Sequence, residues 1–253
     1  MFNQGGSILK NMPPVTKNLI IINFIIWLAM LIIPDKLGID MIKYGALHYV
    51  TASDFNPVQL ITYMFMHSTD SIAHLFFNMF SVFMFGITLE RVLGSKRYLF
   101  YYISCGIGAA IVQEIVWALS FNDMLFSGLA RANLIPREEI ESILSMPEYA
   151  SQLASLSSDF ANQLITIGAS GAVFGILLAF GMIFPNRPLY LMFIPIPIKA
   201  KWMVLGYGAL ELFFGVTQTL DSVAHFAHLG GMIFGFIMIW YWKRKGLFNG
   251  FYY

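Results

Sequence analysis

Two runs of small residues hold the side chains with the clearest chemical potential in this sequence. Ser170 lies between Gly168 and Gly171, and His228 shares one helical face with Gly231 and Gly235. A serine hydroxyl is a weak nucleophile until a base within about 3 Å takes its proton, and histidine is the usual base near neutral pH. The sequence therefore predicts Ser170 as a nucleophile and His228 as its general base.

A second pair of polar side chains is spaced for one face of a helix. His74 and Asn78 are four residues apart, so one lies a helical turn from the other. Both can donate a hydrogen bond toward one point, and the backbone N–H of Ser170 is a third donor. Donors of this kind stabilise the negative charge that develops on a carbonyl oxygen under nucleophilic attack. These three groups are the predicted oxyanion site.

The composition places this chemistry in a membrane. Of the 253 residues, 58% are hydrophobic and 11% are charged, with a mean hydropathy of +0.69; soluble domains carry about 25% charged residues. A net charge of +1, without basic runs, gives no reason to expect a nucleic-acid partner. Cys105 is the only cysteine, which excludes an intrachain disulfide and a thiolate metal cluster.

Apolar segments of spanning length predict an all-α polytopic membrane protein with a six-helix bundle and long outer loops. The expected domain is single and covers residues 1–253, with a core at about 56–242 and a surface insertion at about 120–163. We expect one or two short amphipathic helices on the outer surface in the insertion, and an interfacial loop at residues 189–198. The expected spans are residues 19–33, 72–89, 98–119, 164–184, 202–216 and 224–242.

Lysine and arginine residues mark the cytoplasmic side of short membrane loops, and here they predict the orientation. With the N-terminus inside, eleven basic residues are inner and four are outer, so both termini are predicted to be cytoplasmic in a multi-pass cell-membrane protein. The inner residues are Lys10, Lys17, Arg91, Lys96, Arg97, Arg187, Lys199, Lys201, Lys243, Arg244 and Lys245, and the outer ones are Lys36, Lys43, Arg131 and Arg137.

This topology brings the two small-residue runs together. The predicted fourth and sixth spans run in the same direction, and each has two glycines four residues apart, a motif that lets helices touch. The pairs are Gly171 with Gly175 and Gly231 with Gly235. Ser170 and His228 each lie just before their pair, so we expect them at similar depth, a few residues below the outer surface.

As a set, these motifs resemble the rhomboid family of intramembrane proteases, from about Asn56 to Gly235 with an extra outer insertion. The run from Gly168 to Gly171 matches the family's G-x-S-G nucleophile motif, and His228 with Gly231 and Gly235 matches its catalytic-histidine motif. Two further matches are His74 with Asn78 as the H-x-x-x-N oxyanion element, and Leu89-Glu90-Arg91 with Gly94-Ser95 as the structural turn after the second span.

The resemblance implies a Ser-His dyad without an aspartate, which opens to a water-filled cavity on the outer side. It implies hydrolysis of peptide bonds in or near the membrane helices of other proteins, with single-span membrane proteins as substrates and the lipid bilayer as the surroundings. Phe174 stands where relatives often have a tyrosine stacked under the catalytic histidine. The first outer loop lacks the Trp-Arg pair that many members carry.

Other polar residues admit competing interpretations. His67, His74 and His225 lack the spacing of a metal site, so neither a metal nor another cofactor is expected. His225 is expected to cap its helix or face the outer surface. Glu114 and Glu211 are membrane carboxylates that could relay protons in a transporter, or simply hydrogen-bond to a neighbour. Besides the protease and the transporter, a catalytically silent scaffold that binds membrane helices is the third possible function.

Overall fold

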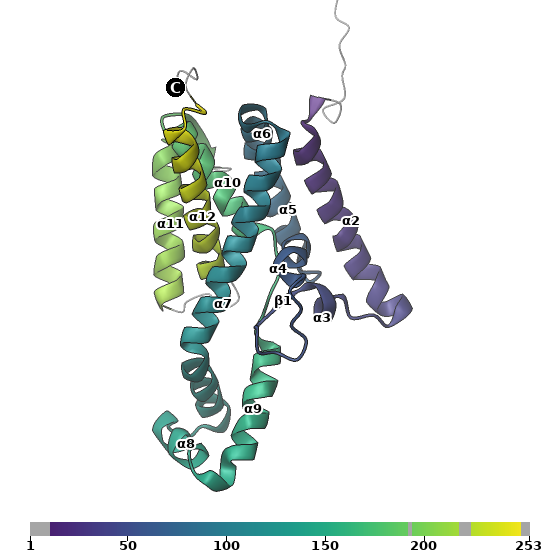
Figure 1. Ribbon diagram of the computed structural model, residues 1–253, viewed down its shortest axis with the longest axis vertical. Helices are drawn as coiled ribbons and strands as arrows, with labels where there is room; N and C mark the ends of the chain where they lie inside the picture. The colour runs from purple at the N-terminus through teal and green to yellow at the C-terminus, as the bar shows by residue number, and fades with distance from the viewer. Residues whose placement is uncertain (1–10, 192–193, 218–223, 249–253) are drawn as a thin grey trace, which may run out of the picture.

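The computed structural model describes residues 11–191, 194–217 and 224–248. These residues form a bundle of helices with an extension at one end (Figure 1). The bundle consists of α2 (Pro14–Leu37), the continuous run α5 (Ile72–Ser81), η2 (Val82–Gly86) and α6 (Ile87–Leu93), and then α7 (Ser95–Asn133), α10 (Ser170–Ile183), α11 (Ala200–Thr217) and α12 (His225–Arg244). The predicted helical class is therefore correct.

Three helical segments in the described part of the chain are long and apolar enough to cross a membrane: α2, the run Ile72–Leu93 and α7. Helix α10 is apolar but shorter, so the count of six spans remains a prediction. The start of α2 and the end of α12 lie at the same end of the bundle, as an even number of crossings requires (Figure 1). Lys10, one of the predicted inner residues, lies outside the described residues.

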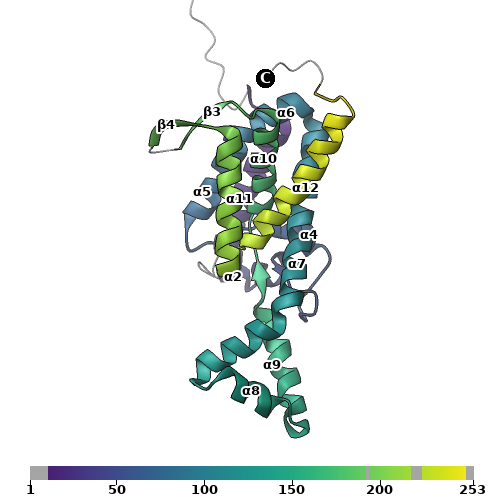
Figure 2. The same ribbon diagram turned by 90° about the vertical axis from the view of Figure 1, so that its left-hand side faces the viewer.

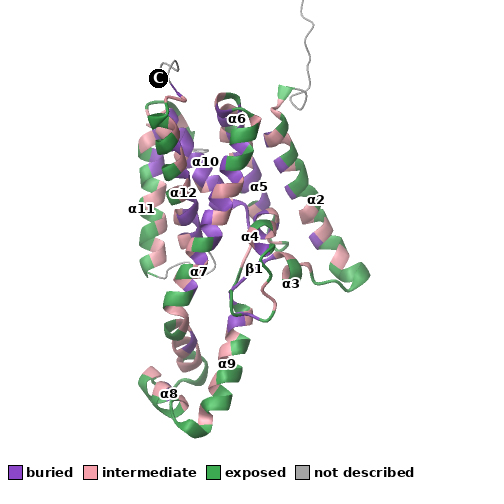
Figure 3. Ribbon diagram, in the orientation of Figure 1, coloured by how far each residue is buried: buried purple, intermediate pink, exposed green. Residues whose placement is uncertain are grey.

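Burial follows the pattern of a bundle in an apolar solvent. Buried residues concentrate where α7, α10 and α12 meet, and the outer faces of the bundle are exposed (Figure 3). Those outer faces carry large apolar side chains, such as Ile25 of α2 and Phe213 of α11. Contact of these side chains with lipid tails costs no free energy, whereas their exposure to water would be unfavourable.

Helix α10 lies inside the bundle, with α11 and α12 beside it (Figure 2). It begins at Ser170, so the expectation of a span from residue 164 was wrong. The preceding segment is extended, and Gly168 has a φ of 127°, a conformation that only glycine adopts readily. Ser170 is consequently the first residue of its helix and not an interior one.

The segment between α2 and α5 supports the approach to Ser170. It contains α3 (Met41–Gly45), β1 (Leu47–His48), α4 (Gln59–Thr62) and the 3-10 turn η1 (Tyr63–Phe65). Strand β1 pairs antiparallel with β2 (Ile165–Thr166), so that Leu47 lies opposite Thr166. The Gly168 N–H then donates to the Tyr63 carbonyl oxygen at 2.9 Å. Two elements distant in sequence therefore fix the chain just before the serine.

The insertion does not lie flat on the bundle. Helix α7 continues well beyond the predicted residue 119, and with α8 (Arg137–Leu144), η3 (Pro147–Tyr149) and α9 (Ala150–Gln163) it projects along the long axis (Figures 1 and 2). No proline interrupts α7 before Pro136, so nothing stops the helix at the expected boundary. Arg137 joins the two arms of the extension through Asp123, at 2.6 Å.

Residues 188–191 and 194–199 form two paired strands where a loop was expected. Strand β3 (Pro188–Leu191) pairs antiparallel with β4 (Ile194–Lys199), and Pro188 lies opposite Lys199. Each strand of a two-stranded ribbon has a free edge, where a proline costs no ladder hydrogen bond. The prolines that argued for an irregular loop are therefore compatible with strands.

Candidate active site

Ser170 and His228 meet at the junction of α10 and α12. The Oγ of Ser170 lies 2.7 Å from the Nε2 of His228, within hydrogen-bond distance. His228 is 7% exposed, and α10 presents Ser170 at its N-terminus. The backbone N–H of a first helical residue has no acceptor inside its own helix, and the helix dipole makes that end positive. The geometry can transfer a proton from the serine hydroxyl to the imidazole.

The predicted glycine contact produces this meeting. A methyl group at Gly231 would overlap the carbonyl oxygen of Gly171, and one at Gly175 would lie 3.2 Å from the Gly231 carbonyl oxygen. A methyl group at Gly235 would lie 3.3 Å from the Cα of Gly175. The two helices therefore touch backbone to backbone, from the residue after Ser170 and about one turn after His228.

Phe174 supports the histidine ring from one side. Its ring is stacked on His228 with centroids 4.3 Å apart and an interplanar angle of 7°. Since Phe174 is one turn after Ser170 in α10, the helix that carries the serine also limits the tilt of the imidazole. The aromatic position implied by the resemblance is thus occupied by a stacked ring without a hydroxyl.

His74 faces the space beside Ser170. A methyl group at Gly168 would lie 2.9 Å from the Nε2 of His74 and 3.6 Å from the Oγ of Ser170, so glycine leaves a small gap between them. The Nδ1 of His74 accepts a hydrogen bond from the Ser68 N–H, at 3.4 Å. A neutral ring that accepts at Nδ1 carries its proton on Nε2. His74 can therefore donate into the gap.

Asn78 is placed more indirectly. Its side-chain Nδ2 donates to the backbone carbonyl oxygen of His74 at 2.9 Å, one turn back along α5. The residue is 6% exposed and lines the same cavity as Ser170 and His74. One amide hydrogen is therefore bound to the His74 carbonyl oxygen. The second amide hydrogen can point into the cavity.

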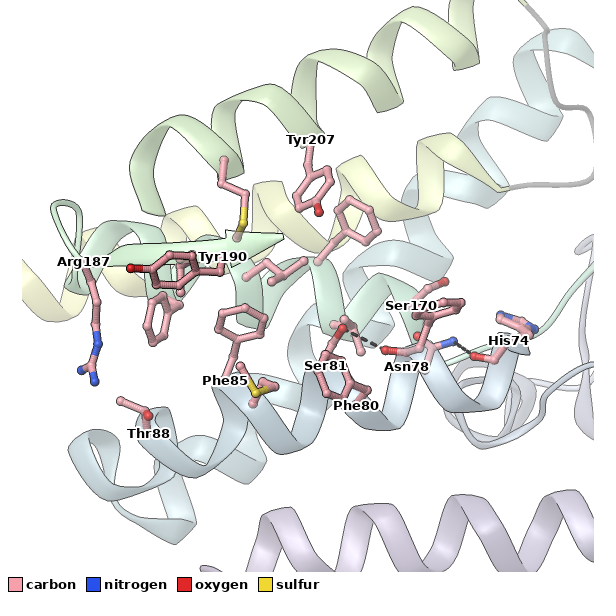
Figure 4. Close-up of a pocket in the computed structure, with 18 of the residues that line it drawn as sticks. His74, Asn78, Phe80, Ser81, Phe85, Thr88, Ser170, Arg187, Tyr190 and Tyr207 are labelled. Atoms are coloured by element: carbon pink, nitrogen blue, oxygen red, sulfur yellow. Dashed lines mark hydrogen bonds between the residues drawn. The ribbon is translucent and has the colours of Figure 1, made fainter. Parts of the chain in front are cut away.

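A cavity of about 870 Å³ leads away from these residues. Ser170, His74 and Asn78 lie at one end, and Arg187 and Thr88 lie at the other (Figure 4). Most of the remaining lining is apolar and comes from α5, η2, α10, α11 and strand β3. The apolar lining residues include Phe77, Phe80, Met84, Phe85, Leu177, Phe180, Leu189 and Met203. The space is suited to an apolar segment whose backbone reaches Ser170.

The expectation that His225 faces the outer surface was wrong. This residue is 7% exposed, and its Nδ1 lies 2.7 Å from the Oε2 of Glu211 in α11. The carboxylate, whose side chain is 14% exposed, attracts the ring inward, because an uncompensated charge there would be costly. The Nδ1 of His228 lies 2.9 Å from the same oxygen. Sequence reasoning considered Glu211 only as a separate carboxylate and missed this pairing with both histidines.

The histidines group differently from the set considered in the sequence. His67 packs on His74 with ring centroids 5.1 Å apart, whereas His225 joins Glu211 and His228. Those last three residues could each offer one ligand atom to a metal. The contacts of 2.7 Å and 2.9 Å to one oxygen are, however, shorter than the edge of about 3.3 Å in a tetrahedral zinc site. The distances suit hydrogen bonds better than shared coordination.

Two further glutamates have structural partners. Glu90 accepts hydrogen bonds from the Thr16 N–H at 2.7 Å and the Ser95 Oγ at 2.7 Å, so it ties α2 to the turn before α7. Glu114 accepts from the Val50 N–H at 2.9 Å. Both Glu114 and Glu211 are thus hydrogen-bonded to neighbours, which was the simpler of the two sequence interpretations.

Comparison with known proteins agrees with the motifs. The rhomboid domain model matches residues 54–245. Rhomboid protein 1, mitochondrial, of Saccharomyces cerevisiae is 30% identical over 53% of this chain and 40% of its own length. RHOMBOID-like protein 6, mitochondrial, of Arabidopsis thaliana is 27% identical over 78% of this chain and 47% of its own length.

A third relative is bacterial. The protein YdcA of Bacillus subtilis, named provisionally as a rhomboid protease, is 30% identical over 48% of this chain and 65% of its own length. The chain thus matches about half the length of these relatives. Because the family model covers most of the sequence, from residue 54 to residue 245, the chain belongs to the rhomboid family.

Proposed function

We propose that this membrane protein is an intramembrane serine endopeptidase that cleaves transmembrane segments of other membrane proteins. The observation that carries the proposal is the 2.7 Å contact between Ser170 Oγ and His228 Nε2 at the end of an apolar cavity. A peptide backbone brought to this end would meet a hydroxyl with a base in place. Single-span membrane proteins are the proposed substrates, and they reach the cavity from the bilayer.

The proposed reaction begins when His228 takes the proton of Ser170 as its Oγ attacks the scissile carbonyl carbon. Negative charge then develops on the carbonyl oxygen. His74 Nε2 and the Ser170 N–H are the proposed donors to that oxygen, and Asn78 supports them. His228 next gives its proton to the leaving amine, and a water molecule hydrolyses the acyl-enzyme through the same base. No cofactor takes part in these steps.

The orientation belongs to the same proposal. Six spans with both termini cytoplasmic would place Ser170 near the outer surface, because α10 starts at the end of the bundle that carries the extension (Figure 1). The basic residues of the α6–α7 turn and of the end of α12 lie at the opposite end. This distribution supports the proposed inner side.

The direct test is cleavage of a panel of single-span proteins by the purified chain in proteoliposomes. We expect shortened products whose new ends lie in or near the transmembrane segment, and no products with Ser170→Ala. Substrate capture without cleavage by the unmodified chain would instead support a silent scaffold. Cleavage that persists in Ser170→Ala would contradict the proposal.

A further inference from the structure

A carboxylate on a third helix stands behind the proposed general base. Glu211 of α11 lies on the side of His228 opposite to Ser170, with its Oε2 at 2.9 Å from Nδ1. The other ring nitrogen, Nε2, contacts Ser170 Oγ at 2.7 Å. Hydroxyl, imidazole and carboxylate therefore follow one another in the order found in catalytic triads.

His225 and His228 are the groups that can balance the negative charge of Glu211. Its side chain is 14% exposed, and the two histidine Nδ1 atoms are its only ion-pair partners in the part of the chain that the structure describes. A carboxylate inside a membrane bundle is costly unless it is paired. Its placement between His225 and His228 is thus the arrangement that compensates its burial.

The two contacts differ in quality. The Nδ1 of His225 forms a hydrogen bond with Oε2 at 2.7 Å. The Nδ1 of His228 is buried and forms no hydrogen bond of good geometry with any described residue, although the same oxygen is 2.9 Å away. A buried ring nitrogen without a partner is unfavourable, and a small rotation of the carboxylate would supply one.

We propose that Glu211 is a positioning residue that accepts a hydrogen bond from His228 Nδ1, so that Ser170, His228 and Glu211 act as a triad. The inference rests on the proposed peptidase function. The carboxylate favours the tautomer that carries its proton on Nδ1, which leaves the Nε2 lone pair facing Ser170. It also stabilises the positive ring that forms when His228 takes the serine proton. His225 holds Glu211 from the other side.

The test compares Glu211→Gln with Glu114→Gln, a matched change of another glutamate of the helical bundle that lies outside the site. We expect Glu211→Gln to lower kcat for a single-span substrate by about 10-fold to 1,000-fold, with little change in KM. Glu114→Gln should retain activity. Glu211→Asp, which keeps the charge, should recover part of the loss.

The tautomer of His228 separates positioning from a structural role, because an acceptor at Nδ1 keeps the ring proton on that nitrogen. In the unmodified chain, ¹⁵N NMR of labelled histidines should show His228 protonated at Nδ1. This measurement does not depend on whether a variant folds.

The outcomes are distinguishable from a failure of the peptidase proposal. Full activity of Glu211→Gln, with Ser170→Ala inactive, would overturn the triad alone. A ring protonated at Nε2 would do the same. Activity lost on treatment with EDTA and restored by zinc would assign the three residues to a metal instead. Equal activity of Ser170→Ala and the unmodified chain would overturn the peptidase proposal itself.

Discussion

Gly231 of α12 packs directly on the backbone of Gly171 in α10, with no room between them for a methyl group. Gly171 is the residue after Ser170, and Gly231 lies about one helical turn after His228. Because Ser170 and His228 belong to different helices, their 2.7 Å separation depends on how closely those helices approach. The glycine contact is therefore a structural requirement for the site as well as for the bundle.

Replacing Gly231 with alanine should therefore damage stability and activity together. The added methyl group would meet backbone atoms, which cannot move aside, at a cost of about 1–3 kcal/mol or more. Gly206→Ala is the matched control, because a methyl group at Gly206 of α11 would meet no atom of a neighbouring described element within 4 Å. Thermal unfolding in detergent should show a lower Tm only for Gly231→Ala. Equal Tm values for both variants would contradict the close contact.

The oxyanion donors should affect kcat more than KM, because they act on charge that forms in the transition state. His74→Ala is expected to lower kcat by about 10-fold to 1,000-fold. Asn78→Ala should have a smaller effect, because one of its amide hydrogens is bound to the His74 carbonyl oxygen. Steady-state kinetics with a single-span substrate checks both. A fully active His74→Ala enzyme would remove His74 from the oxyanion site, and matching losses of Tm would indicate structural roles.

His225 and His228 give a test of the helix register. Their ring centroids are 6.4 Å apart, and only His228 reaches Ser170. We expect His228→Ala to abolish proteolysis and His225→Ala to reduce it by less than about tenfold, since a base must lie within hydrogen-bond distance of the hydroxyl. Proteolysis assays on the two purified variants measure this. The reverse order of effects would move the base one turn toward the start of α12.

His67 should make stability depend on pH. Burial, and secondarily the nearby His74, lowers the pKa of His67 from 6.5 to about 3. Between these values the unfolded chain binds a proton that the folded chain does not, so stability falls as pH decreases, by about 1.4 kcal/mol per pH unit for one group. Both ring nitrogens of His67 are buried and have no hydrogen-bond partner among the residues that the structure describes, which disfavours the charged ring.

Replacing His67 with phenylalanine should remove this contribution. The difference in Tm between pH 7 and pH 4 should be smaller for His67→Phe than for the unmodified chain. Other titrating groups are common to both proteins, so the comparison isolates His67. An identical pH dependence in the two proteins would show that His67 is protonated equally in the folded and unfolded states.

Much of the site could be predicted because its residues sit in short local patterns. The spacing of His74 and Asn78, and the glycines after Ser170 and His228, each define a helix face without knowledge of the fold. The contact between the two helices then follows from their parallel direction and from the small residues that let their backbones approach. The close contact of the glycines confirms that part of the prediction, while the catalytic roles await experiment.

The start of α10 and the role of Glu211 depended on long-range contacts. The strand pair β1–β2 and the conformation of Gly168 displace the helix start to Ser170, and hydropathy alone does not reveal either. Glu211 and His228 lie on different helices, α11 and α12, so no local pattern in the sequence predicts their contact. One signal was available: Gly208 and Gly215 lie three and four residues away from Glu211, so they mark the face of α11 that packs on α12.

The most direct test of the central claim is labelling of the detergent-solubilised protein with a fluorophosphonate probe. Such probes react with an activated serine, and the account predicts that mass spectrometry will place the label on Ser170. Ser170→Ala and His228→Ala should both lose the label, while Ser120→Ala, a change in α7 away from the site, should keep it. Labelling that persists in Ser170→Ala would contradict the claim that Ser170 is the nucleophile.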